Sequence, residues 1–132
     1  MVTTYFKNLV ADVVWKTAAG ASLPETYYLA ASTTQPLEDG TGVTEPDSAT
    51  GYSRVAMSEL AQAVDGVTTN SAAISWPKVI LDAGAVTHWA LFDAAEGGNL
   101  LMGGEFDSVK HLDPGTTLTV EAEGLELHVL GA

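Results

Sequence analysis

Hydrophobic and polar positions alternate in two different ways along this chain, and the first pattern is helical. Between residues 4 and 16, apolar side chains recur at spacings of three and four, which predicts one amphipathic helix. Thr3 or Thr4 is the expected N-cap, and Gly20 is expected to close the region. The apolar stripe consists of Tyr5, Phe6, Leu9, Val10, Val13 and Val14.

After this segment the pattern changes to short runs separated by turn residues, which is typical of β-strands. Apolar residues alternate with polar ones near the C-terminus, a period of two that indicates half-buried antiparallel strands. The predicted strands are 26–32, 52–57, 72–76, 85–92, 100–106, 116–121 and 125–130. The turn sequence AEGGN at 95–99 predicts a hairpin between the fourth and fifth of these.

The fold class that follows is mainly β: a small antiparallel β-sandwich or jelly-roll-like domain of about seven strands with one N-terminal helix. Residues 1–20 form the helix and a connector, residues 21–132 form the sandwich, and the two make a single structural domain. A long polar segment at 33–51 separates the first two strands. A loop of that length in a compact domain is usually functional or mobile.

The amino-acid composition excludes several classes of function. The 132 residues include no cysteine, so disulfides and thiolate metal sites are excluded. Seventeen acidic residues face five basic ones, a formal charge of −12, which predicts repulsion from nucleic acid and from anionic membranes. The apolar runs are too short for a membrane helix, and no signal peptide is recognisable, so synthesis in the cytoplasm is expected.

Candidate chemistry is sparse. His88, His111 and His128 do not follow a metal-binding or nucleophile-activating pattern, so no catalytic, cofactor-binding or metal-binding residue is predicted. The acids of the 33–51 loop (Glu38, Asp39, Glu45 and Asp47) are a weak calcium candidate, and a solvated acidic loop is the better interpretation. The aromatic residues, among them Trp15, Trp76 and Trp89, lie in apolar runs. Core packing is therefore expected for them in preference to a sugar-binding face or an interface.

An ordered series of short motifs carries a family resemblance over residues 26–130. It comprises GVTEP at 42–46, GYSRV at 51–55, ISWP at 74–77, GAVTHWALFDA at 84–94, GGNLL at 97–101 and GTTLTV at 115–120. In this order they resemble a family of short phage virion proteins, usually called tail-fibre proteins and in some members head decoration proteins. The resemblance implies a structural protein of the particle with no catalytic motif.

The shortness of the chain favours head decoration over a long repetitive fibre, and its negative charge favours the outer surface of the particle. We therefore expect a decoration (cement) protein that binds the phage major capsid protein. The alternative is a tail-associated module that binds tail proteins or a host surface glycan. A homo-oligomer is expected in either case, a trimer being one possible form. The candidate contact residues are Tyr5, Phe6, Leu9, Val10 and Val13 on the helix, and Pro36, Leu37, Val43 and Pro46 in the loop.

Overall fold

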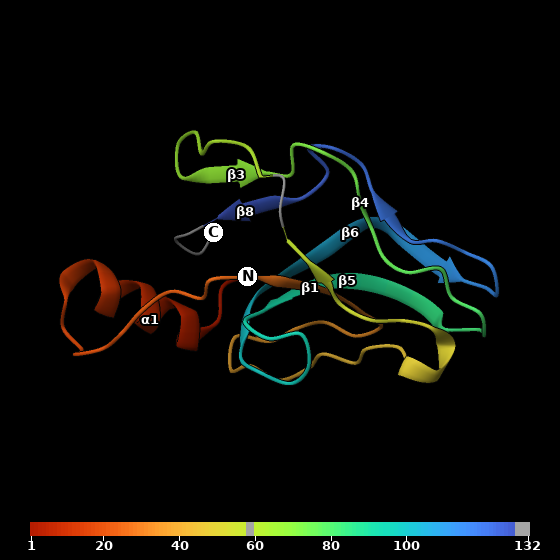
Figure 1. Cartoon of the computed structure of the whole chain (residues 1–132), viewed down its shortest axis with the longest axis horizontal. Coiled ribbons are helices and arrows are strands. Elements are labelled where there is room, and N and C mark those ends of the chain that lie inside the picture. Colours follow the sequence, from red (N-terminus) through yellow and green to blue (C-terminus); the bar gives the residue numbers. More distant parts are fainter. Residues whose placement is uncertain (58–59, 129–132) are drawn as a thin grey trace.

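The fold was obtained as a computed structural model of the chain, in which residues 1–57 and 60–128 are described. Its centre is a four-stranded antiparallel sheet with the strand order β2-β1-β5-β6. Two two-stranded antiparallel ribbons, β3-β8 and β4-β7, lie over this sheet (Figure 1). The elements in chain order are α1 (Thr4–Trp15), β1 (Tyr28–Ser32), the 3-10 turn η1 (Ser48–Thr50), β2 (Val55–Ala56), β3 (Val67–Thr69), β4 (Ile74–Ser75), β5 (Gly84–Phe92), β6 (Leu100–Leu112), β7 (Thr119–Val120) and β8 (Glu126–His128).

The predicted fold class is confirmed: the protein is mainly β, its sheets are antiparallel, and one helix stands at the N-terminus. The structure describes eight strands, one more than the pattern predicted. The additional strand is β3, which pairs with β8 through Val67 and His128. Residues 129 and 130 of the last predicted strand lie outside the described residues.

The main core lies between the four-stranded sheet and the two ribbons. Alternate residues of the central strands point into it, for example Leu29 and Ala31 of β1 and Leu91 of β5. The ribbons contribute Val120 of β7 and Leu127 of β8 from the other side, and Trp76 packs edge-on against Phe106 with their ring centroids 6.3 Å apart. Burying apolar side chains from both layers provides the main driving force for this arrangement.

The opposite face of the central sheet carries a smaller core, which consists of Ala30, Ala90, Phe92 and Leu100 with Met1 and Val43 packed against it. Small side chains on this face let the 33–51 loop approach closely. At Gly103, an added Cβ would lie 2.9 Å from the ring of Pro36, so only glycine allows this contact without a shift. The loop is therefore part of the packed structure.

The N-terminal residues continue the sheet before the helix begins. Val2 forms an isolated antiparallel bridge with Met102 of β6, and the backbone N–H of Thr3 donates to the carbonyl of Leu101 at 2.9 Å. The Thr3 hydroxyl accepts a hydrogen bond from the N–H of Phe6, so Thr3 is the N-cap, as predicted for Thr3 or Thr4. The helix is thus fixed to β6 at its first turn.

The helix ends at Trp15, within one residue of the predicted 4–16 segment. Its C-cap is Lys16, which adopts the left-handed conformation with φ 56°, and Gly20 does not cap it. The N–H of Thr17 donates to the Asp12 carbonyl and its hydroxyl to the Asp12 carboxylate. These bonds supply the C-terminal partners that a glycine cap would otherwise provide.

Candidate binding surface

The helix α1 extends away from the sheet, with its root packed and its far end in solvent (Figure 1). Phe6 is the one buried residue of the helix and meets Tyr27 edge-on, with ring centroids 6.5 Å apart. Leu9 and Val10 are half-buried against the main core. Val13 is half-buried and Tyr5 is exposed. Of the five helix residues predicted for contact, Tyr5 therefore presents the most open side chain, and Phe6 is used for the interior.

The four predicted loop residues divide in the same way. Pro36 is buried against Gly103, and Val43 is half-buried against the smaller core. Leu37 is exposed, and Pro46 is half-buried beside an open cleft. The contact role predicted for these residues stays a prediction. The structure shows which of them, Leu37 and Tyr5 above all, are accessible on the single chain.

The structure brings the start of the helix and the loop together. The backbone N–H of Thr4 donates to the carbonyl of Glu38 at 3.0 Å, which satisfies one of the free amides of the first helical turn. Tyr5 and Leu37 are the sequence neighbours of these two residues. The two predicted contact elements thus meet at the root of α1.

At its other end, the loop is held by four residues that we call the Arg54 cluster: Glu45, Tyr52, Arg54 and Phe92. The Arg54 guanidinium donates to both Glu45 carboxylate oxygens, at 3.0 and 2.8 Å, and lies 3.7 Å over the Phe92 ring. The Tyr52 hydroxyl donates to Glu45 at 2.6 Å and accepts from the N–H of Ala31 at 3.0 Å. The paired fork is the strong form of an ion pair, so the cluster joins the loop, β1 and β5.

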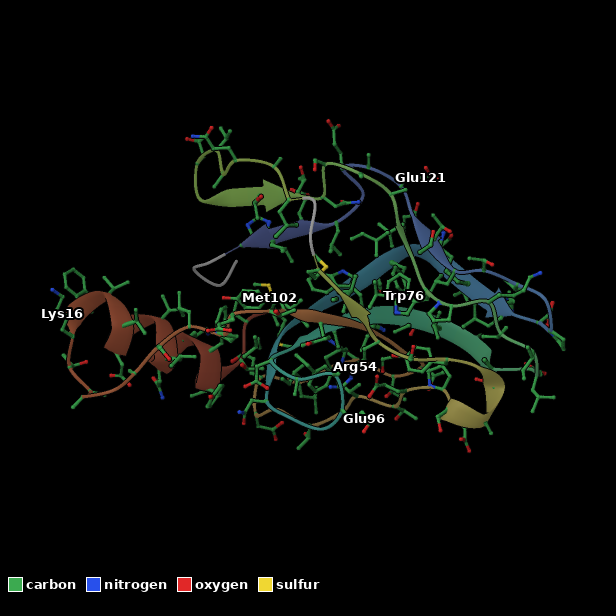
Figure 2. The ribbon with its side chains drawn as sticks, viewed as in Figure 1. Lys16, Arg54, Trp76, Glu96, Met102 and Glu121 are labelled. Atoms are coloured by element: carbon green, nitrogen blue, oxygen red, sulfur yellow. The ribbon has the colours of Figure 1, made fainter. Side chains whose placement is uncertain are left out.

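Arg54 also reaches the turn between β5 and β6. Its Nη1 donates to the carbonyls of Ala94 and Gly97, both at 2.8 Å. Figure 2 shows Arg54 beside this turn, with Glu96 at the outer side. The motifs GVTEP and GYSRV that carried the resemblance therefore supply the two charged partners of one structural ion pair.

The surroundings of the cluster shift two pKa values. Burial raises the pKa of the Glu45 carboxyl, but hydrogen bonds from Arg54 and Tyr52 outweigh it, so the net pKa lies below the ordinary value. Burial raises the pKa of the Tyr52 hydroxyl far above its usual range, and the hydrogen bond to Glu45 adds to this effect. At neutral pH the cluster contains a carboxylate, a guanidinium and a neutral phenol.

An open cleft of about 580 Å³ lies beside this cluster, lined by Pro46, Ser48 and Ser53 together with residues of the turn and the cluster. The charged groups of Glu45 and Arg54 already bind each other there. They are consequently committed to the fold and offer little free charge to a ligand.

Three of the four acids of the 33–51 loop have separate structural roles. Asp39 accepts from the N–H and hydroxyl of Thr41, Asp47 caps η1, and Glu45 pairs with Arg54. In residues 1–57 and 60–128, no group of three or more His, Asp or Glu side chains gathers as a metal site would require. The structure thus adds no support to calcium binding by the loop.

The three histidines lie in three different surroundings. His88 contacts the Thr87 hydroxyl at 2.7 Å and lies 3.8 Å from Glu105, whereas His128 lies 3.9 Å from Glu126. His111 is exposed on β6. No helix in the part of the chain that the structure describes has the length and apolar character needed to cross a membrane.

One aromatic residue departs from the expected core position. Trp76 and Trp89 are buried, but Trp15 is 74% exposed at the end of α1. The expectation of core packing is therefore wrong for Trp15. Its position on a helical wheel gives the reason. With 100° per residue, Trp15 falls outside the apolar stripe formed by Phe6, Leu9 and Val13. This offset is visible in the sequence and was the signal that Trp15 would be exposed.

A family model described as Podophage GP4 fiber I protein gp80 matches residues 1–128. Among curated proteins, no significant match was found. Because the family match covers nearly the whole chain, this protein belongs to the podophage GP4 fiber I protein gp80 family of phage virion proteins.

Proposed function

We propose that the protein is a non-enzymatic structural component of the fibre apparatus of a podophage particle. The observation that carries the proposal is the family match over residues 1–128. It favours the tail-associated alternative that the sequence left open over the expected head decoration role. The fold is compatible with this use, because the sheet and loop are packed together while α1 extends outward as an attachment element (Figure 1).

Charge supports a location away from packaged DNA. The chain carries −12 formally, and few basic residues are available to neutralise phosphates. Attachment to another virion protein then depends on local apolar contact. Tyr5 and Leu37 provide exposed apolar side chains for it.

A sugar-binding role has less support. Stacking on a sugar ring needs an accessible aromatic face, but Trp76 and Trp89 are 2% and 8% exposed. Trp15 is 74% exposed, but it lies at the end of α1 beside the apolar side chain of Val14. Phe92 has Arg54 over its ring. The proposal is therefore restricted to assembly within the particle.

The test is the number of copies and their position in purified particles of the phage that carries the protein. Quantitative mass spectrometry should give far fewer copies than the major capsid protein, and antibody labelling seen by electron microscopy should mark the tail. A copy number close to that of the major capsid protein, with label over the head, would establish the decoration role and refute the proposal. Absence from purified particles would refute both roles.

A further inference from the structure

The far end of α1 exposes an apolar surface. Trp15 is 74% exposed and Val14 is 57% exposed, and Lys16 follows directly. Figure 2 shows Lys16 at the end of the helix, well away from the sheet. Tryptophan is enriched among the residues that dominate binding energy at protein interfaces. We call Val14, Trp15 and Lys16 the helix tip.

A matching apolar pocket lies at the root of the same helix. It has a volume of about 180 Å³, and its walls include Phe6, Tyr27, Met57, Leu91, Met102 and Leu127. A dry cavity of about 150 Å³ holds a benzene molecule, so a pocket of this size can accept most of an indole ring. We call it the root pocket.

The helix tip cannot reach the root pocket of its own chain. Phe6 lines the pocket and Trp15 lies nine residues further along the same helix, a distance of about 13 Å at 1.5 Å per residue. A second copy removes this restriction. Because Trp15 lies on the side of α1 opposite Phe6, the contact is head to tail: the tip of one chain enters the root pocket of the next chain, and repeated contacts of this kind can close a ring.

Charge favours a second copy as the occupant. Residues 1–20 contain two lysines and one acid, whereas the rest of the chain contains sixteen acids and three basic residues. Lys16 stands at the helix tip, and the carboxylate of Glu126 lies 3.9 Å from the imidazole of His128, which lines the root pocket. Docking would therefore place a lysine near an acidic rim.

We infer that the helix tip binds the root pocket of a second copy of this chain, with Trp15 as the anchor and Lys16 facing Glu126. This contact makes the protein a homo-oligomer through its helical arms. The inference does not depend on where in the particle the protein resides, so its failure would leave the proposed function intact.

The first experiment measures self-association of the full chain by sedimentation equilibrium, for the wild type and for Trp15→Ser. Because Trp15 is exposed, its replacement should leave the fold unchanged, as circular dichroism can verify. Loss of a tryptophan anchor should raise the dissociation constant at least ~10-fold. The matched control is Val109→Ser, which changes a 51% exposed apolar side chain in the second half of β6, away from the residues that meet the helix root, and should leave the constant unchanged.

The second experiment tests the charge pairing. Lys16→Glu and Glu126→Lys should each weaken association, and the double variant should recover it, a result that a general charge effect would not give. A wild-type chain that stays monomeric at its highest soluble concentration would overturn the inference. So would an oligomer that Trp15→Ser leaves intact, or a Trp15-dependent contact made only with another virion protein.

Discussion

The guanidinium carbon of Arg54 lies 3.7 Å from the centroid of the Phe92 ring. Phe92 is the last residue of β5, so this contact fixes Arg54 at the edge of the turn into β6. From there the same guanidinium reaches Glu45 in the 33–51 loop and two carbonyls of the turn. A single side chain thus connects two loops that are distant in sequence, which makes it the most informative residue to replace.

Replacing Arg54 by alanine should lower the free energy of unfolding by about 3 kcal/mol. The variant leaves the partly buried Glu45 without its cation and removes the contact over Phe92. Urea denaturation measures the change. Lys110→Ala is the control, because its partner Asp107 is almost fully exposed and such pairs contribute little. Equal losses in the two variants would show that Arg54 does not have the structural role assigned to it.

Acidification should remove the contribution of Glu45. The pKa of this carboxyl in the folded protein lies below its ordinary value of 4.5, so its stabilising effect is complete above that pH and is lost as the pH falls through the lower, folded value. The difference in free energy of unfolding between wild type and Glu45→Gln should therefore be largest near neutral pH and shrink below pH 4.5. Asp39 and Asp107 also have lowered pKa values, but both variants retain them and their effects cancel. If this difference in the free energy of unfolding did not change with pH, the stabilising role assigned to the ionised Glu45 carboxylate would be contradicted.

Local patterns predicted the helix and the central hairpin, because both depend on neighbours in sequence. The N-cap Thr3 and the apolar stripe define α1 within one residue of its predicted end, and the glycines of the turn permit the pairing of β5 with β6. The two ribbons are different. Residue 74 pairs with 120 and residue 67 with 128, and no local signal specifies a partner so far away.

The candidate surface was predictable only in part, for a similar reason. The helical period identified the apolar face of α1, but that face becomes the interior at Phe6, and Trp15 stands outside it. The motifs containing Glu45 and Arg54 were visible, yet nothing in their spacing of nine residues indicates an ion pair. Side-chain networks between loops have no period, so their partners appear only in the folded chain.

Adding a single methyl group at Gly104 should destabilise the protein. A Cβ there would lie 2.6 Å from Nε1 of Trp89, whose side chain is buried, so Gly104→Ala should cost about 1–3 kcal/mol. Tryptophan fluorescence should shift as the indole moves. Gly20→Ala is the control for backbone strain without a packing clash. Gly20 has a φ of +79°, but nothing lies within 4 Å of an added Cβ. That control should cost about 1 kcal/mol without a fluorescence change; an unchanged spectrum for Gly104→Ala would refute the packing argument.

The attachment of α1 to β6 should depend on the hydroxyl of Thr3. This group accepts from the N–H of Phe6 and lies 2.8 Å from the carbonyl of Leu100, and the residue is fully buried. Thr3→Ala removes the cap and leaves buried backbone groups unpaired, so a loss of about 2 kcal/mol is expected in urea denaturation. Thr3→Ser keeps the hydroxyl and should lose about 1 kcal/mol at most, the value of a buried methyl group. Thr4→Ala, at an exposed position one residue later, should be nearly neutral. If Thr3→Ala and Thr4→Ala were equally mild, the helix would be held by its apolar and backbone contacts, and the cap would have no part in orienting the arm.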